Sequence, residues 1–436
     1  MFFYYIKLAM LSFKRNPILS LLMVLAIAFG IGALMTTITV NYLMSNNPIK
    51  EKNDVLYHIQ LDSWSPYEAA RDDDAPPLQL TWTDVNNLQQ AEQAFRQAAM
   101  ARSGGIIEPE NPDVKPFQSS FRLTFTDFFP MFNVPFIYGA GWDASADQNA
   151  EHVVVLSRDV NDRIFGGENS VGESVTISGE TFQVVGVIDE WHPVPKFFDL
   201  NTGDFGGTAD VFIPLSLKLP MELPSWGNTN CWKPPEGTGF LAFLNSECVN
   251  YQFWVELTSP QDEARYHTFL DSYVEQQKAL GRFPRPLNNR MSNVQEWLEY
   301  NEVVADDAQI MMWLSMMFLL VCLLNTIGLM LSKFIGKSGE IGLRRAVGAT
   351  RGDLFMQHLV ETACIGVAGG LLGLLFSYFG LQGVRTLYGE FADRLTTLDS
   401  NMMLLAIGIS TITTIIAGIY PTWRASAIAP AGQLKG

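Results

Sequence analysis

The chain has 436 residues, of which 48% are hydrophobic and 17% are charged, and its formal net charge at pH 7 is −16. This composition is too apolar for an ordinary soluble protein and too charged for a protein embedded wholly in a lipid bilayer. The sequence therefore predicts membrane-spanning helices joined to a globular domain.

The basic residues are concentrated in three short segments, 1–17, 333–357 and 421–436. Together these segments hold ten Lys or Arg residues and only two acids, Glu340 and Asp353. Because cytoplasmic segments of membrane proteins carry an excess of Lys and Arg, we expect all three to face the cytoplasm. The remainder of the chain is strongly acidic and is expected on the opposite side.

The N-terminal segment predicts an interfacial helix followed by a first membrane span. In residues 1–17, Lys7 and Lys14 are seven residues apart and fall on one side of a helix, which is typical of an elbow along the cytoplasmic surface. Residues 18–43 carry no charge and are long enough to cross a bilayer and project beyond it as a stalk. A cleaved signal peptide is the alternative, but the apolar run is too long for one and no cleavage site follows.

Residues 44–307 predict an extracytoplasmic α+β domain. Runs rich in β-branched residues predict strands at 153–156, 174–177, 181–188 and 211–214. The turn residues 178–180 favour a hairpin between the second and third of these strands.

The later part of this domain contains an irregular excursion, a further strand and two helices. The excursion, residues 218–250, is rich in Pro, Gly, Asn and Trp, and Cys231 and Cys248 within it are spaced for a loop-closing disulfide in an oxidising compartment. After a strand at 251–257, Ser259 and Pro260 begin a helix that should stop at Gly281. A second helical pattern covers 294–304.

Three further uncharged stretches, 308–332, 362–384 and 401–423, are each long enough to span a bilayer. Four spans place both termini on one side of the membrane, with a short extracytoplasmic loop at 385–400 and a cytoplasmic tail at 424–436. The third span carries interleaved small-residue pairs, which favour close helix packing either within one subunit or across a dimer seam. These residues are Gly366, Gly369, Gly370 and Gly373.

The cytoplasmic segment 333–361 predicts a short amphipathic helix that ends at Gly348. The apolar residues Ile341, Ala346, Val347 and Ala349 alternate with basic ones, Arg344, Arg345 and Arg351, which gives one apolar and one cationic side. Such a helix is suited to docking on a partner. The alternative is a basic loop that only fixes the membrane topology.

The order of residues in this segment resembles the hallmark of the MacB/FtsX/LolC permeases, the type VII ABC transporters. The matching positions are Glu340, Ile341, Gly342, Arg344, Arg345, Ala346, Gly348, Ala349 and Glu361. Residues 121–141, the strand around 153–156 and residues 184–188 occur in the order of a MacB-type periplasmic domain. The tail resembles the family's closing motif, in which a proline, here Pro421, ends the last span and a basic, Ala-rich segment follows.

The resemblance implies a permease of the bacterial inner membrane with a large periplasmic domain and cytoplasmic termini. It assigns ATPase coupling to Glu340, Ile341, Arg344, Arg345, Gly348, Ala349, Arg351 and Glu361. It also implies a separate ABC ATPase dimer as partner, since the chain begins at the elbow helix, and a second permease copy or paralogue. A periplasmic adaptor, an outer-membrane channel and membrane lipid complete the expected partners, and no nucleic acid is expected.

The expected function is efflux of peptides, antibiotics or toxins, driven by ATP hydrolysis on the partner. The alternatives are an FtsX-like mechanotransmitter that activates a periplasmic partner and LolC-like lipoprotein extraction. The chain itself is not expected to be an enzyme. The last three residues of a phosphate-binding loop are matched by Gly336, Lys337 and Ser338, but the position of its first glycine is occupied by Leu331, so we expect no nucleotide site here. We predict no metal site and no cofactor in this chain, with ATP and magnesium on the ATPase.

Overall fold

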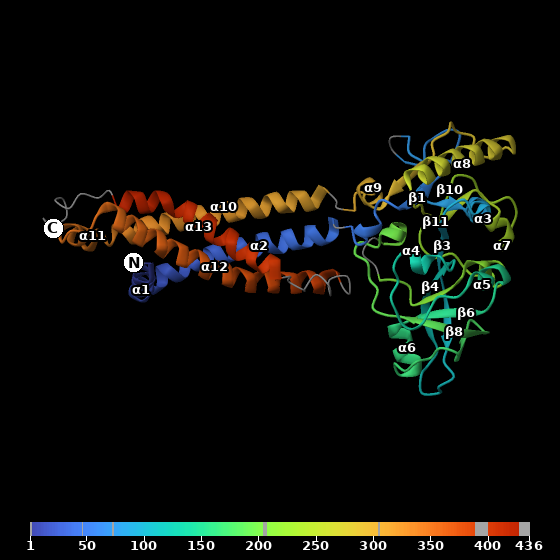
Figure 1. Ribbon diagram of the computed structural model, residues 1–436, viewed down its shortest axis with the longest axis horizontal. Helices are drawn as coiled ribbons and strands as arrows, with labels where there is room; N and C mark the ends of the chain where they lie inside the picture. Colours follow the sequence, from blue (N-terminus) through green and yellow to red (C-terminus); the bar gives the residue numbers. More distant parts are fainter. Residues whose placement is uncertain are drawn as a thin grey trace. The chain divides into compact units, whose positions relative to one another are not determined.

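The computed structural model describes residues 2–45, 47–71, 74–203, 207–303, 306–388 and 400–426. The chain divides into two compact units, one of Met1–Met44 with Val304–Gly436 and one of Ser45–Val303. The first unit is helical and the second is built on a β-sheet (Figure 1). Residues 389–399 of the predicted loop and 427–436 of the predicted tail lie outside the described residues.

Six helices form the first unit within the described part of the chain. They are α1 (Phe2–Arg15), α2 (Pro17–Ser45), α10 (Asp306–Ile335), α11 (Ser338–Ala346), α12 (Arg351–Tyr388) and α13 (Ser400–Ser426). Four stretches are long and apolar enough to cross a membrane: Pro17–Tyr42, Gln309–Ile335, Arg351–Val384 and Leu404–Ser426. The predicted fold class, four membrane-spanning helices with an α+β domain, is confirmed.

Helix α12 begins at Arg351, well before the predicted start of the third span at residue 362. The reason is a reciprocal cap at its N-terminus. The backbone N–H of Asp353 donates to Thr350 Oγ1 at 3.1 Å, and the N–H of Thr350 donates to Asp353 Oδ2 at 3.1 Å. Residues 351–361, predicted as part of a coupling loop, are therefore the first turns of a membrane helix.

Helix α13 continues through Pro421 to Ser426, so the prediction that this proline ends the last span is wrong. Proline removes one intrahelical hydrogen bond, but neighbouring helices can compensate for that loss in a membrane bundle. Here Pro421, Thr422, Ala425 and Ser426 are all buried, so one packed face carries the helix past the proline.

The glycines of α12 bring two neighbouring helices close on two different faces. A Cβ at Gly369 would lie 2.6 Å from Ile27 Cγ2, and one at Gly373 would lie 2.8 Å from Ile31 Cγ2, both on α2. A Cβ at Gly366 would lie 3.0 Å from Thr411 Cα of α13, and Gly370 faces Ser410 of the same helix at 3.0 Å. Both faces are thus used for packing inside the chain.

The second unit contains one twelve-stranded sheet among the described residues. The strands are β1 (Leu56–Gln60), β2 (Leu80–Thr81), β3 (Arg96–Glu108), β4 (Phe117–Thr124), β5 (Phe136–Gly139), β6 (Val153–Ser157), β7 (Ser174–Ile177), β8 (Glu180–Ile188), β9 (Val211–Pro214), β10 (Asn230–Cys231), β11 (Cys248–Glu256) and β12 (Arg290–Asn293). Their order is β12-β1-β11-β3-β4-β9-β6-β8-β5, with β2 and β10 on β11 and β7 on β3 and β8.

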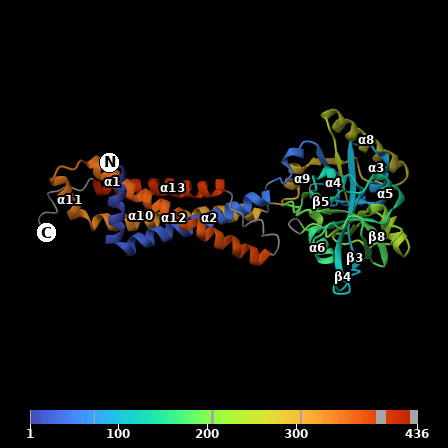
Figure 2. The same ribbon diagram turned by 60° about the horizontal axis from the view of Figure 1, so that its bottom comes forward.

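The long strand β3 joins the two halves of this sheet. Its first part, 96–100, pairs antiparallel with β11, and its second part, 101–107, pairs with β4, beside which it runs in Figure 2. The predicted hairpin is present as β7 and β8, which pair antiparallel from Ser174↔Gln183 to Ile177↔Glu180. Strands β6 and β9 also lie where the sequence predicts them.

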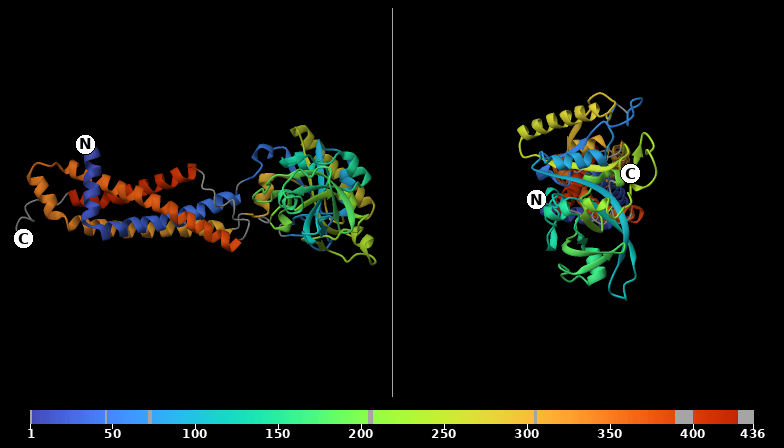
Figure 3. Two further views of the ribbon diagram at one scale, coloured as in Figure 1. Left: turned by 90° about the horizontal axis from the view of Figure 1, so that it is seen from below. Right: turned by 90° about the vertical axis from the view of Figure 1, so that its right-hand side faces the viewer.

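The helices of the second unit cover the sheet and bury two apolar clusters against it. Their bounds are α3 (Trp82–Ala91), α4 (Phe128–Met131), α5 (Ala144–Asn149), α6 (Arg158–Phe165), α7 (Phe240–Leu244), α8 (Pro260–Ala279) and α9 (Val294–Tyr300), with 3₁₀ turns η1 (Lys50–Lys52), η2 (Phe197–Thr202) and η3 (Leu215–Lys218). Helix α8, yellow in Figure 3, lies along one edge of the domain and follows the Ser259 cap and Pro260 as predicted.

Helix α9 ends at Tyr300, four residues before the predicted boundary at 304. Its last carbonyls are capped by a reversed turn: Val303 N–H donates to Leu298 O at 3.2 Å and Glu302 N–H to Glu299 O at 3.0 Å. Glu302 adopts a φ of 48°, in the left-handed region that ends helices, and Val303 is buried.

Cys231 and Cys248 are joined by a disulfide with their Cα atoms 4.2 Å apart. The bridge fixes β10 to the start of β11, where Cys231 and Cys248 are direct partners in the ladder. The intervening excursion has little regular structure, with α7 as its main element. The disulfide therefore anchors a loop that the sheet alone holds by only two residues.

Packing at Gly373 can be tested by substitution to valine. We expect Gly373→Val to lower the free energy of unfolding by about 1–3 kcal/mol, because the added atoms overlap Ile31 in an already close-packed contact. Gly383→Val on the same helix is the matched control, since nothing lies within 4 Å of a Cβ there. Thermal unfolding in detergent measures both, and equal midpoints would contradict the packing assignment.

The disulfide gives a second prediction for this fold. Replacing both Cys231 and Cys248 by serine should destabilise the extracytoplasmic domain by about 3 kcal/mol, the loss expected for a closed loop of this size. Reduction of the wild-type protein should produce the same shift, and reduction of the double variant should add nothing. If the variant unfolds at the wild-type temperature, the bridge is not a stabilising element.

Candidate functional site

The candidate site is centred on α11, the short helix between the long helices α10 and α12. After its last residue, Ala346, the chain turns back through Gly348, whose φ of 108° is in the left-handed region. Ala349 N–H donates to Arg344 O at 3.0 Å and Gly348 N–H to Arg345 O at 3.2 Å, which closes the helix end. A Cβ at Gly348 would meet nothing, so the backbone conformation alone requires glycine.

The two sides of α11 differ from the prediction. Ile341 is buried, whereas Leu343 is 59% and Val347 82% exposed, and Ala346 is also exposed. Positions three and four apart share a helix face, so Leu343, Ala346 and Val347 lie together on one side, while Ile341 and Arg344 share the other. The sequence predicts one apolar and one cationic side for α11; in the structure the exposed side carries Leu343, Ala346 and Val347, because Arg344 is bonded within the chain and Arg345 is half-buried.

Arg344 is held inside the chain. Its Nη2 lies 2.9 Å from Glu340 Oε1 and its Nη1 donates to Gln357 Oε1 of α12 at 2.8 Å. The other carboxylate oxygen of Glu340 accepts from Arg15 Nη1 of α1 at 2.8 Å. Glu340 therefore connects α1 with α11, and Arg344 connects α11 with α12.

Behind α11, Glu361 forms a buried cluster of charged and polar groups. Its Oε1 lies 2.7 Å from Lys333 Nζ and 3.9 Å from Lys337 Nζ, and it also accepts a hydrogen bond from Ser12 Oγ. Its Oε2 lies 3.5 Å from His358 Nδ1, one turn earlier on α12. The side chains of Glu361 and Lys333 are 2% and 1% exposed.

This cluster brings four helices together. Ser12 belongs to α1, Lys333 to the end of α10 and Glu361 to α12. Lys333 Nζ also donates to Ser20 Oγ of α2 at 3.0 Å, and the ammonium lies 5.2 Å from the centre of the Phe13 ring. A buried ion pair of this kind is stable only if further hydrogen bonds satisfy its remaining polar atoms, which the two serines help to do.

Lys337 occupies the edge of the cluster, between the end of α10 and the start of α11. Its Nζ donates to Ser12 Oγ. Burial lowers the pKa of the Lys337 ammonium, and the positive charge of Lys333 acts in the same direction, while Glu361 opposes both. The carboxylate of Glu361 is therefore shared between two ammonium groups on consecutive elements of the chain.

Of the predicted residues, Arg344 and Ala349 line a cavity of about 530 Å³ between α1, α11 and α12. The cavity is also lined by Tyr4 and Tyr5 of α1, by Leu343 of α11 with Val347 after it, and by Asp353 and Gln357 of α12. Arg345 is half-buried and Arg351 is exposed at the start of α12. The structure thus joins Glu340 to Arg344 and places Arg344 and Ala349 on one cavity. Glu361 belongs instead to the buried cluster with Lys333, and the four glycines of α12 belong to the helix packing described above.

Sequence reasoning missed several members of the Glu361 cluster. Ser12 and Ser20 carry no distinctive pattern in an apolar helix, and Lys333 and Lys337 serve in the sequence only as markers of the cytoplasmic side. One signal was available: His358 and Glu361 are three residues apart, and ionisable groups in an apolar helix need a buried partner. Lys333, at the end of the preceding span, is such a partner.

Two family models match the chain. The MacB-like periplasmic core domain matches residues 20–266, and the FtsX-like permease C-terminal domain matches residues 312–430. The first covers the first span and most of the β-sheet unit, and the second covers α10 to α13 with the site around α11.

Individual relatives are similar at 23–26% identity. The macrolide export ATP-binding/permease protein MacB of Bdellovibrio bacteriovorus is 24% identical over 303 residues, 69% of this chain and 41% of that protein. The pyoverdine export ATP-binding/permease protein PvdT of Pseudomonas syringae is 26% identical over 317 residues, 71% of this chain and 41% of that protein. MacB of Chlorobium luteolum aligns over 99% of this chain and 60% of its own length.

This chain therefore spans only about two fifths of the first two of these curated relatives. Among solved structures, the periplasmic region of MacB from Actinobacillus actinomycetemcomitans is similar with a TM-score of 0.37 at 16% identity, covering 58% of this chain and 95% of that one.

The Glu361 cluster can be tested by a double-mutant cycle. Glu361→Gln leaves the ammonium of Lys333 buried without a counter-charge, so we expect the free energy of unfolding to fall by about 3–5 kcal/mol. Lys333→Met in the same chain should recover part of this loss, because the unpaired buried charge is then gone.

Glu275→Gln provides the control for this cycle. Glu275 makes a salt bridge to Lys278 but its side chain is 58% exposed, so its loss should change stability by no more than about 0.5 kcal/mol. Thermal unfolding in detergent is compared for the wild type, Glu361→Gln, Lys333→Met, the double variant of these two and Glu275→Gln. If Glu361→Gln is as mild as Glu275→Gln, the cluster does not hold the helices together.

Proposed function

Because this chain belongs to the MacB/FtsX family of ABC transporter permeases, we propose that it is the permease subunit of a MacB-like export system. In this proposal an ABC ATPase on a separate polypeptide hydrolyses ATP at the cytoplasmic face and drives a conformational change in the extracytoplasmic domain. The relatives named for macrolide and pyoverdine export support efflux of a peptide, antibiotic or toxin. A second permease copy or paralogue, a periplasmic adaptor and an outer-membrane channel are the further partners proposed.

The observation that carries the proposal is the way in which α11 is tied to the membrane helices. Arg344 binds Gln357 of α12, and Glu340 binds Arg15 of α1. Directly behind them, Glu361 binds Lys333 and Ser12. A displacement of α11 therefore cannot be absorbed locally, because its charged side chains are bonded to the helices on either side.

The orientation proposed for the chain follows from its charges. We propose that α1, α11 and the last described residues of α13 face the cytoplasm, because they belong to the basic segments 1–17, 333–357 and 421–436. The ATPase then meets the apolar outer face of α11, formed by Leu343, Ala346 and Val347. Exposed large apolar side chains of this kind mark a protein interface when they lie outside the lipid.

Substitution of the basic residues of α11 tests docking less clearly than substitution of its apolar residues. Arg344→Glu would place a carboxylate next to Glu340 and break the contact with Gln357, so a loss of function could arise within the chain. Leu343 and Val347 are exposed and bring only apolar side chains to the cavity between α1, α11 and α12, so their replacement leaves the ion pairs of Arg344 and Glu340 in place.

We therefore predict that Leu343→Asp with Val347→Asp abolishes binding of the ATPase while the permease remains folded. Desolvating two carboxylates in an apolar interface costs several kcal/mol, which is enough to reduce the affinity at least about a thousandfold. The measurement is co-purification of the ATPase from membranes, with its chains identified by mass spectrometry, and the ATPase activity of the complex.

Leu280→Asp is the matched control, because Leu280 is 75% exposed at the end of α8 in the extracytoplasmic domain. It should leave both the recovered ATPase and its activity at wild-type levels. A Leu343 and Val347 double variant that still retains its ATPase would exclude this face as the docking site.

A further inference from the structure

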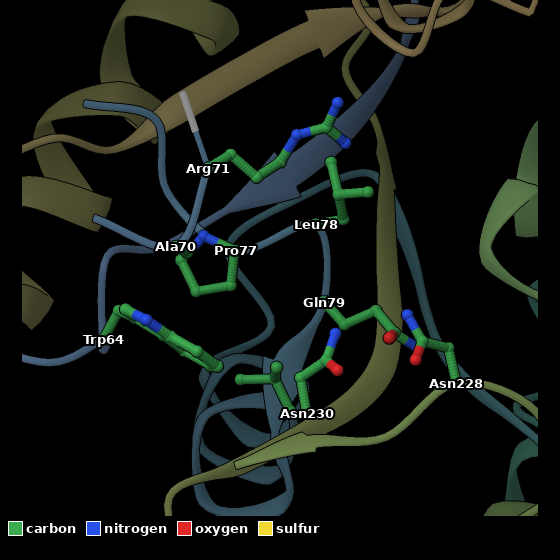
Figure 4. Close-up of a pocket in the computed structure, with 9 residues that line it drawn as sticks. Trp64, Ala70, Arg71, Pro77, Leu78, Gln79, Asn228 and Asn230 are labelled. Carbon is green, nitrogen blue, oxygen red and sulfur yellow. The ribbon is translucent and has the colours of Figure 1, made fainter. Parts of the chain in front are cut away.

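A polar cavity in the extracytoplasmic domain takes no part in the function proposed above. It has a volume of about 360 Å³ and lies where the start of β11 is flanked by β2 and β10. Its lining comes from the loop that precedes β2, from β10 with the residues before it, and from Val249 of β11 (Figure 4).

Three carboxamide side chains face this cavity, those of Gln79, Asn228 and Asn230. In Figure 4 they lie close together on one side of it. Within the part of the chain that the structure describes, none of the three carboxamides makes a hydrogen bond to another protein group. Gln79 is only 2% exposed.

The carboxamide atoms of Gln79 are not among the fully buried polar atoms of the described residues that lack a partner, so they are open to a molecule in the cavity, as expected of polar groups that make no protein hydrogen bond. Each carboxamide offers two N–H donors and one carbonyl acceptor. Three of them in one cavity therefore match a ligand with several groups that both donate and accept, such as neighbouring hydroxyls.

The opposite side of the cavity is apolar and carries an indole. Trp64 stands across from the carboxamides in Figure 4, and Pro77 and Val249 are buried in the lining. Among the described residues that line the cavity there is no acid, and the basic one, Arg71, places its guanidinium 5.2 Å from the centre of the Tyr300 ring. This lining favours an uncharged ligand with one apolar face and one polar edge.

We propose that this cavity binds a neutral saccharide, with a pyranose face stacked on Trp64 and its hydroxyl or acetamido groups hydrogen-bonded to Gln79, Asn228 and Asn230. A sugar ring combines both properties, since its C–H face is apolar and its edge carries hydroxyls. An indole supplies a flat apolar surface for such a face. The cavity volume falls within the range of sites for small ligands.

An extended peptide fits the site less well. Peptides that bind at a sheet usually add a strand to a free edge through backbone hydrogen bonds. Here Val249 already pairs with Asn230 of β10 on one side and Thr81 of β2 on the other. No edge of β11 is therefore open at the floor of the cavity.

The disulfide gives the site its rigidity. Cys231 and Cys248 are the immediate neighbours of Asn230 and Val249, so the bridge fixes one carboxamide relative to the floor. Asn228 and Asn230 are exposed residues of the irregular excursion and would otherwise have little to hold them. Such preorganisation reduces the entropy lost when a ligand binds.

The test is binding of maltose and N,N′-diacetylchitobiose to the full-length protein in lipid nanodiscs, which avoids detergents with sugar headgroups. Saturation-transfer difference NMR detects the bound sugar at millimolar concentration, and titration calorimetry gives the affinity. We expect at least one of the two sugars to bind, with the strongest saturation on the C–H protons of one ring face.

Two variants at the cavity, one single and one double, are then compared with two controls. Trp64→Ala should abolish the saturation signal, and Asn228→Ala with Asn230→Ala should weaken binding about tenfold, the loss of roughly one net hydrogen bond or more. Tyr67→Ala, at a residue 92% exposed outside the cavity, and Asn245→Ala, an exposed residue of the same excursion, should bind as the wild type does.

The asparagine variants alter only exposed side chains, so their result does not depend on the effect of Trp64→Ala on folding. Absence of binding for both sugars overturns the proposal, as does unchanged affinity in the asparagine double variant. Tighter binding of an uncharged tetrapeptide than of either sugar would also overturn it and assign the cavity to peptides.

Discussion

The buried contact between Glu361 and Lys333 is the constraint on which the helical unit depends. Two opposite charges inside an apolar bundle are stable only together, since removing either leaves the other without compensation. Their partners Ser12 and Ser20 belong to α1 and α2, so the pair connects these two N-terminal helices with α10 and α12. The short helix α11, attached through Arg344 and Glu340, is held to the same group of helices.

Helix packing complements this electrostatic contact. The glycines of α12 allow α2 to approach on one face and α13 on another, and Ser410 Oγ donates to Gly366 O at 2.7 Å. In lipid, where apolar side chains gain little from leaving the solvent, such close backbone contacts are a principal source of helix association. The ion pair and the glycine contacts therefore hold α12 to its neighbours at different positions along its length.

The sequence predicts those parts of the fold that depend on local patterns. The apolar runs predict the four spans, and the β-branched runs predict β6, β7, β8 and β9. It fails where a distant residue decides: nothing near Glu361 indicates Ser12, and nothing near Gln79 indicates Asn228 and Asn230. It also fails at helix ends: the uncharged stretch predicts that the third span begins at residue 362, after Glu361, whereas the cap between Thr350 and Asp353 begins the helix at Arg351.

Helix α12 runs for 38 residues from Arg351 to Tyr388 without a break. At 1.5 Å per residue, Glu361 lies about 15 Å from the beginning of this rod and about 40 Å from its far end. Glu361 therefore divides the helix into a short and a long segment, and a rigid helix that rotates about this point moves farther at the end of the long segment. If α12 pivots at this ion pair, a movement of about 1 Å beside α11 becomes about 3 Å at Tyr388, so the position of Glu361 along the helix would set the ratio of the two displacements.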